Sequence, residues 1–311
     1  MNHCQLILEA LHFPQEFTDG ERAVLCSDRM GVRRVETGEV LIREGDTDRD
    51  MWLLLQGAFQ VVKRTQPNLP LGVLHSGSFC GEIAWFTGQP RTASVIASEP
   101  GLVLRFDFEQ SHGYPPELLL KIYHNLLADV IGRKATLHDT LFRLASLERD
   151  QFDGGIVSSP VGYLPGIPLL AAFTPEEQRL LHTLKPGPES IPAGGYLYRE
   201  GSRYDHFFIL LKGSVKVTLQ RDPALVLVNM GPERLLGLDS FFRDGLHQAN
   251  LVAVEACEGV RISLAELQAL EPLFRLKFYW GMALTLVNRL SPLNIARIKL
   301  EHMEGKMWFG G

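Results

Sequence analysis

The chain of 311 residues contains an internal repeat, which limits its possible folds more than any other feature of the sequence. Residues 35–61 and 191–217 align without a gap at an offset of 156, with nine identical residues among 27 positions. The identical residues of the first copy are Gly38, Leu41, Arg43, Glu44, Gly45, Leu54, Leu55, Gly57 and Val61. Because the offset is about half the chain and about the size of one domain, the sequence predicts two tandem copies of one fold.

Each copy predicts the same order of elements. Thr18 with Glu21, and Thr174 with Glu177 at the same offset, are capping-box pairs that open a short helix. Short apolar runs between turn glycines follow in each copy and are typical of an antiparallel barrel or jelly roll.

A long helix is predicted over residues 115–150, where leucines and other apolar residues recur at three, four or seven positions. The stretch 153–167 has four glycines and two prolines and is predicted to be a linker. We therefore predict a mainly β protein with flanking helices (α+β). Its two tandem jelly-roll β-barrel domains span 1–152 and 168–311, and residues 273–290 of the second form a further helix.

Composition narrows the classes of function. The chain has 45% hydrophobic residues but no run of 18 apolar residues, and its first residues lack a basic stretch followed by an apolar one. We expect a cytoplasmic protein with no membrane partner. A net charge of -5 argues against nucleic acid as the main partner, and we expect no specific DNA binding, because affinity for phosphate backbones comes from clustered lysine and arginine. The four cysteines and ten histidines lack metal-ligand spacing, so we expect scattered free or buried thiols and no metal.

The sequence CGEIAWFTGQPRTASV at 80–95 is the most specific motif of the chain. It resembles the phosphate-binding cassette of cyclic-nucleotide-binding domains, which occurs in the catabolite activator protein family, cyclic-nucleotide-dependent kinases and nucleotide-gated channels. That cassette has the pattern Gly-Glu-x-Ala, a short spacer, then Arg-Ser/Thr/Ala-Ala. The ligand-binding residues that the resemblance implies are Gly81, Glu82, Ile83, Ala84, Arg91, Thr92 and Ala93.

The residue types of this motif suit a cyclic phosphodiester, which carries one negative charge. Backbone N–H groups at 81–84 and the permanent cation of Arg91 can hold that charge. The resemblance implies that Glu82 accepts a hydrogen bond from the ribose 2′-hydroxyl. Thr92 does not separate cAMP from cGMP, so the regulatory ligand is expected to be one or the other. In the family the C-terminal helix closes over the base, and Arg133, Lys134, Thr136 or His138 can touch it here, although a solvated or dimer-facing role is expected for each of them.

Other interpretations of the same residues remain open. Glu82 and Arg91 can instead form a surface ion pair of little energetic value. Trp85 and Phe86 are expected to pack in the core rather than to stack on a base.

The second copy keeps the scaffold but not the charged groups of the motif. At the offset of 156 it has Gly237, but Leu238 and His247 stand where the glutamate and arginine stand in the first copy. The segment 235–256 resembles the sensory domain of the oxygen-sensing branch of the same superfamily. We expect a structural or docking copy, although His247 or Asp239 can serve a different ligand.

The leading hypothesis is a non-catalytic regulatory protein whose first domain binds cAMP or cGMP. It signals to an unidentified protein partner and forms a homodimer through helix 115–150. No combination of nucleophile, base and metal in the sequence supports an enzyme. The alternative is an interaction scaffold that responds to another ligand, such as a cyclic dinucleotide, or to none. The basic residues Arg289, Arg297, Lys299 and Lys306 are expected to be a solvated helix face rather than a DNA contact.

Overall fold

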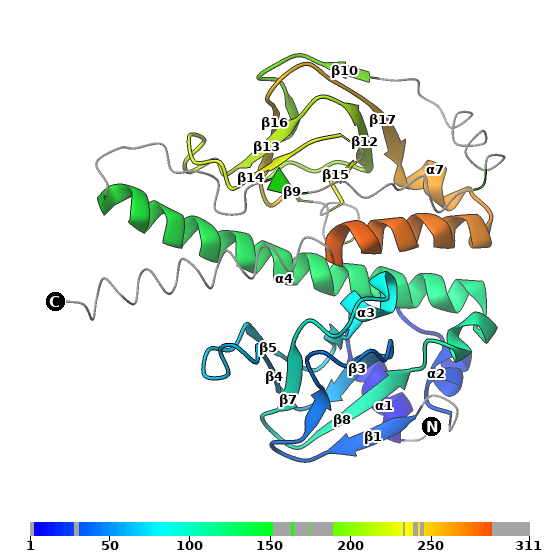
Figure 1. Cartoon of the computed structure of the whole chain (residues 1–311). Coiled ribbons are helices and arrows are strands. Elements are labelled where there is room, and N and C mark those ends of the chain that lie inside the picture. The colour runs from blue at the N-terminus through cyan, green and yellow to red at the C-terminus, as the bar shows by residue number, and fades with distance from the viewer. Residues whose placement is uncertain are drawn as a thin grey trace. The chain divides into compact units, whose positions relative to one another are not determined.

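The structure is a computed structural model of the whole chain, shown in Figure 1. It describes residues 3–27, 31–151, 163–164, 174, 189–232, 234–238, 242 and 246–287. The chain divides into two compact units, Met1–Val130 and Ile131–Gly311, so the division falls within one long helix. The predicted domain boundaries at 152 and 167 lie outside the described residues and stay predictions.

The described helices and strands of the first domain are drawn in blue to blue-green in Figure 1. Its elements are α1 (His3–Ala10), α2 (Asp19–Leu25), β1 (Val32–Val35), β2 (Val40–Ile42), β3 (Met51–Gln56), β4 (Phe59–Val62), β5 (Gly72–Leu74), β6 (Phe79–Cys80), α3 (Glu82–Thr87), β7 (Ser94–Ala97), β8 (Gly101–Phe106) and the 3-10 helix η1 (Gln110–Gly113). The strands form two antiparallel sheets, in the orders β1-β8-β3-β6 and β2-β7-β4-β5.

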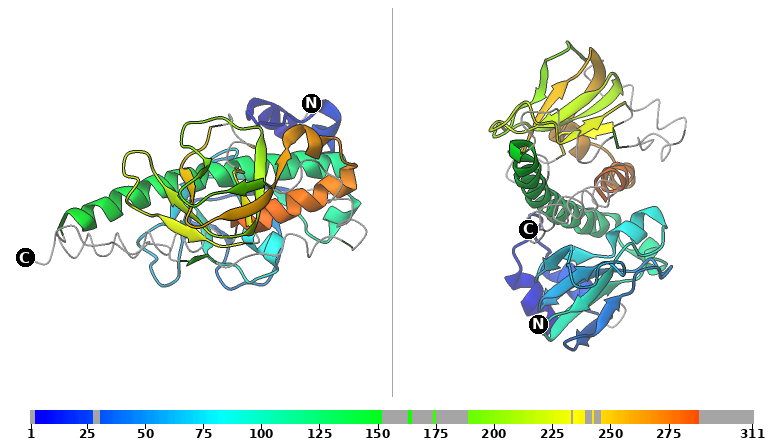
Figure 2. Two further views of the ribbon diagram at one scale, coloured as in Figure 1. Left: turned by 90° about the horizontal axis from the view of Figure 1, so that it is seen from above. Right: turned by 60° about the vertical axis from the view of Figure 1, so that its left-hand side comes forward.

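The second domain repeats this arrangement, and Figure 2 shows both domains from two further directions. Its described elements are β9 (Tyr163–Leu164), β10 (Glu189–Ile191), β11 (Tyr196–Tyr198), β12 (His206–Lys212), β13 (Val215–Thr218), β14 (Val228–Met230), β15 (Arg234–Leu236), β16 (Asn250–Ala253), β17 (Cys257–Ser263) and α7 (Leu264–Gln268), and residues 272–287 are also helical. The sheet orders are β10-β17-β12-β15 and β11-β16-β13-β14-β9, the same as in the first domain apart from β9.

In each domain the core lies between the two sheets. One cluster of buried residues in the first domain takes members from all eight strands, β1 to β8. A corresponding cluster in the second domain takes members from β10 to β17. The predicted fold class is therefore confirmed, but each predicted barrel consists of two separate hydrogen-bonded sheets rather than one closed sheet. Part of the predicted linker also differs, because β9 pairs in parallel with β14.

The predicted capping box at Thr18 opens α2. The Thr18 hydroxyl accepts from the N–H of Glu21 at 3.3 Å, and the Glu21 carboxylate accepts from the N–H of Thr18 at 2.7 Å. The equivalent pair at Thr174 and Glu177 falls largely outside the described residues. The predicted long helix is α4 (Pro116–Gln151), whose proline lies at the first turn, where its missing N–H costs nothing.

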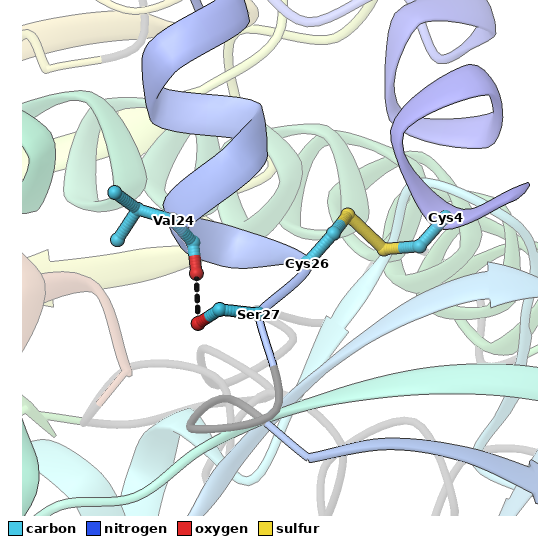
Figure 3. Close-up of a disulfide and its surroundings, with 4 residues drawn as sticks. All are labelled: Cys4, Val24, Cys26 and Ser27. Atoms are coloured by element: carbon cyan, nitrogen blue, oxygen red, sulfur yellow. Dashed lines mark hydrogen bonds between the residues drawn. A yellow bond between two sulfur atoms is a disulfide. The ribbon is translucent and has the colours of Figure 1, made fainter. Parts of the chain in front are cut away.

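The expectation of four unpaired cysteines is wrong for two of them. Cys4 of α1 and Cys26, directly after α2, form a disulfide with a sequence separation of 22 residues, drawn in Figure 3. The spacing carries no local signal, because the pairing arises only when the two helices fold against each other. Cys80 and Cys257 are buried free thiols, as the sequence predicted.

Among the described residues, no helix is long and apolar enough to cross a membrane. The described residues also include no group of three or more His, Cys, Asp or Glu side chains that could hold a metal ion.

Candidate functional site

The site begins at a glycine whose conformation and surroundings exclude any other residue. Gly81 precedes α3 with a left-handed backbone (φ 87°). A Cβ atom at this position would lie 2.6 Å from the carbonyl oxygen of Asp50 and 2.7 Å from Nη1 of Arg91. Both distances are shorter than real contacts allow, so the chain turns here and lets the arginine lie directly against its backbone.

Arg91 is the central cation of the site and is only 4% exposed. Its Nη1 donates to the carbonyl oxygen of Gly81 at 3.0 Å, and its Nη2 donates to the carbonyl oxygen of Asp50 at 2.6 Å. The main chain of Arg91 is held as well, because its N–H donates to the Asp46 oxygen at 2.8 Å and its own oxygen accepts from Gly45 at 2.9 Å. A buried guanidinium fixed in this way is a preorganised partner for one anion.

The Asp48 carboxylate is the anion that contacts this guanidinium. It accepts from Nε of Arg91 at 3.3 Å and from Nη2 as well. Burial raises the pKa of Asp48, but the hydrogen bonds and charge of Arg91 outweigh it, so the net pKa is lowered. Because the Asp48 side chain is 53% exposed while that of Arg91 is 2% exposed, the carboxylate approaches the buried cation from the solvent side.

The other predicted residues lie around this pair. Glu82, the first residue of α3, is 5% exposed, and Ala84 is also buried. Ile83, Thr92 and Ala93 are half-buried. The alternative of a surface ion pair between Glu82 and Arg91 is therefore wrong, because both side chains are buried. Of the four residues that can touch a base from the helix, Lys134, Thr136 and His138 have side chains outside the described residues.

Trp85 and Phe86 belong to the core, as predicted. Trp85 packs edge to face on Phe108 at a centroid distance of 5.1 Å, and Phe86 packs likewise on Tyr123 of α4 at 5.3 Å. Burial raises the pKa of Tyr123 to about 12. These contacts fix α3 on its apolar side.

Sequence reasoning missed the role of the segment Asp48-Arg49-Asp50. Arg49 lies over the ring of Phe108 at 3.5 Å and donates from Nη2 to the Trp85 oxygen at 2.6 Å, at the C-terminal end of α3. A cation there satisfies carbonyls that the short helix leaves open. Alternating charges directly before the apolar strand at 51–55 were the available signal.

Helix α4 contacts the strand that leads into the site. The N–H of Phe79 in β6 donates to the Asp129 carboxylate at 3.1 Å. Nearby on α4, Asn125 exchanges two hydrogen bonds of 2.8 Å with the main chain of Gln15, and Lys121 pairs with Glu21 at 2.7 Å. One face of α4 is thus tied both to the strand before Gly81 and to the region of α2.

Comparisons with known proteins match both halves of the chain to one family. The family model described as "Cyclic nucleotide-binding domain" matches residues 32–112 and 188–271. A Drosophila melanogaster cAMP-dependent protein kinase type II regulatory subunit is 22% identical over 250 residues, which are 79% of this chain and 55% of that protein. The Drosophila cGMP-dependent protein kinase isozyme 1 is 25% identical over 198 residues, 63% of this chain and 21% of the kinase.

Among solved structures, the cAMP-bound regulatory domain of Toxoplasma gondii PKA is 16% identical with a TM-score of 0.31, covering 88% of this chain and 92% of that one. The chain spans about half of the length of the Drosophila regulatory subunit and about a fifth of that of the Drosophila kinase. Because the family model matches more than half of the chain, in two separate segments, the chain belongs to the cyclic-nucleotide-binding domain family and carries two such domains in tandem.

Proposed function

We propose that the first domain binds cAMP or cGMP at Arg91 and Glu82 and that the chain is a non-catalytic regulatory protein. The observation that carries this proposal is the buried Arg91 guanidinium, which is held by two carbonyl oxygens and meets one solvent-accessible carboxylate. A cyclic phosphate has the charge and the acceptor oxygens to replace Asp48 on this cation. Glu82 then serves the ribose hydroxyl, as expected from the cassette.

Signal transmission is proposed to run through α4. Exchange of Asp48 for phosphate alters the hydrogen bonds at the carbonyl oxygens of Gly81 and Asp50, and Gly81 directly follows β6. Because Asp129 of α4 accepts from Phe79 of β6, the helix is hydrogen-bonded to the strand that leads into the site. The recipient is proposed to be a protein partner rather than a specific DNA sequence, in keeping with the net charge of -5.

Calorimetric titration of the full chain with cAMP, cGMP and a cyclic dinucleotide tests the proposal. Arg91→Ala leaves the buried phosphate charge without its cation and is expected to weaken binding by roughly 2 to 5 kcal/mol, or about thirty-fold to several-thousand-fold. Arg33→Ala, which removes an exposed arginine paired with Glu39, is the control and is expected to bind like the parent. Equal binding by the Arg91→Ala and parent proteins, or binding of the cyclic dinucleotide alone, contradicts the proposal.

A further inference from the structure

The two domains place their cassettes on the same backbone frame. Gly237 has a left-handed backbone like its counterpart, with φ of 82°. The N–H of His247 donates to Ser202 at 3.0 Å and its oxygen accepts from Gly201 at 2.9 Å. These bonds repeat those that hold the main chain of Arg91, at the offset of 156. Differences between the sites therefore come from side chains and not from the course of the chain.

A tyrosine of the second domain lies where the first domain has its arginine. A Cβ atom on Gly237 would lie 2.4 Å from Cζ and 2.6 Å from the hydroxyl oxygen of Tyr198. A Cβ atom on Gly81 would lie 2.7 Å from Nη1 of Arg91. The Tyr198 ring, which comes from the position of Ile42, therefore occupies the space beside the glycine that the guanidinium fills in the first domain.

The tyrosine also takes over the hydrogen bond of the arginine. Its hydroxyl donates to the carbonyl oxygen of His206 at 3.3 Å. His206 stands at the position of Asp50, whose carbonyl oxygen accepts from Nη2 of Arg91. The same acceptor is thus satisfied in both domains, by a guanidinium in one and by a neutral hydroxyl in the other. Burial raises the pKa of Tyr198, so the hydroxyl keeps its proton.

Further rings close the remaining space around Tyr198. Its ring centroid lies 4.1 Å from that of His247 and 5.2 Å from that of Tyr204, which replaces Asp48. Tyr198 is 1% exposed and His247 is 2% exposed. Leu238, at the position of the ribose-binding glutamate, is buried as well. Where the first domain holds a cation and two carboxylates, the second holds packed rings and a leucine.

We infer that Tyr198 is the residue that excludes cyclic nucleotides from the second domain, because its ring and hydroxyl fill the phosphate position from within the chain. Asp48 meets solvent and can yield to an incoming phosphate, whereas expelling a fully buried ring opens a ring-sized cavity that a charged phosphate cannot fill favourably. The second domain is thereby held in one conformation that does not respond to nucleotide, and restoring the lost charged groups alone does not reopen it.

The test uses the full chain with Arg91→Leu, which removes the first site and so separates this inference from the function proposed above. In that background we compare Leu238→Glu/His247→Arg with the same variant carrying Tyr198→Ile, using fluorescent cAMP and cGMP. Both are first checked for folding by circular dichroism. The variant with Tyr198→Ile is expected to bind at least tenfold more tightly. Equal affinity of the two, binding by the Arg91→Leu parent, or no binding by a folded Tyr198→Ile variant overturns the inference.

A second measurement titrates the chain with its natural second site, so it tests the inference even if those variants do not fold. The chain with its natural sequence is labelled with 3-fluorotyrosine, and the Tyr198 fluorine resonance is assigned by its loss in Tyr198→Phe. Saturating cAMP or cGMP is expected to leave the resonance in place and without a solvent isotope shift. A resonance that moves to a solvent-exposed position on titration shows that nucleotide displaces the ring and refutes the inference.

Discussion

The carboxylate of Asp48 and the guanidinium of Arg91 form an ion pair in which only the acid is open to solvent. An incoming phosphate has to displace or share this acid, so Asp48 acts as an internal competitor. Asp48→Asn is expected to tighten cyclic-nucleotide binding about two- to tenfold, a modest gain because the carboxylate is half exposed and screened. Calorimetry measures the change.

Asp46→Asn is the matched control for this prediction. Asp46 lies two residues away, is exposed, and loses the same charge when replaced by asparagine. Any effect of net charge alone appears in both variants. If both variants bind the nucleotide equally more tightly than the parent, or if Asp48→Asn binds it more weakly, Asp48 is not an internal competitor of the phosphate.

Glu82 is predicted to select ribose over deoxyribose. Glu82→Ala removes hydrogen bonds to a neutral hydroxyl and leaves the phosphate contacts intact, so it is expected to weaken cAMP or cGMP binding less than Arg91→Ala does. The sharper readout is 2′-deoxy-cAMP, which the parent should bind more weakly than cAMP, whereas Glu82→Ala should bind the two alike. Preserved discrimination in Glu82→Ala speaks against this role.

The Cys4–Cys26 disulfide is predicted to stabilise the first domain. It closes a loop with a sequence separation of 22 residues, and the chain-entropy estimate for such a loop is about 3 kcal/mol. Reduction, or Cys4→Ser/Cys26→Ser, is expected to lower the denaturation midpoint of the first domain. Cys80→Ala, which removes a buried free thiol, is the control and should remain sensitive to reductant. If reductant leaves the denaturation midpoint of the parent protein unchanged, the disulfide does not form in solution.

The second domain is predicted to lose stability on mild acidification through His206. Burial lowers the pKa of His206, and the adjacent Asp205 carboxylate only partly offsets this. The folded domain thus binds fewer protons than the unfolded chain. The contribution of neutral His206 to the free energy of unfolding is therefore complete above the ordinary histidine pKa near 6.5. It declines as the pH falls below that value. Urea unfolding at pH 7.5 and 5.5 measures the slope.

His206→Gln is expected to flatten this pH dependence, and His75→Gln, which changes an exposed histidine of the first domain, is not. An unchanged slope in His206→Gln assigns the acid sensitivity to other groups.

Self-association through helix 115–150 is retained as a prediction, on a narrower basis than the sequence suggested. Ile122, Leu126, Val130 and Leu137 of its apolar seam are already buried within the chain. Leu119 is half-buried, and the other two seam residues, Leu141 and Leu144, have side chains outside the described residues. We expect a homodimer in sedimentation at tens of micromolar that Leu141→Ser/Leu144→Ser dissociates. A monomeric mass of the parent, with and without nucleotide, contradicts it.

The sequence alone determined the features that depend on local patterns or on self-comparison. The offset of 156 predicted two copies of one fold, and the sheet orders of the two domains agree with it. The capping box at Thr18 and the helix starting at Pro116 follow from neighbouring residues whose backbone groups need specific partners. The cassette predicted that Gly81 and Arg91 belong to one site, and the hydrogen bond between them is consistent with this.

Tertiary structure decided which residues distant in the sequence contact the cassette and each other. The pairing of Asp48 with Arg91 joins residues 43 positions apart, and the disulfide needs two helices to pack first. Tyr198 reads in sequence as an ordinary strand residue, and only the fold brings its ring onto Gly237. Such contacts depend on which strands lie side by side, and that arrangement is set by burial of the whole core rather than by any local segment.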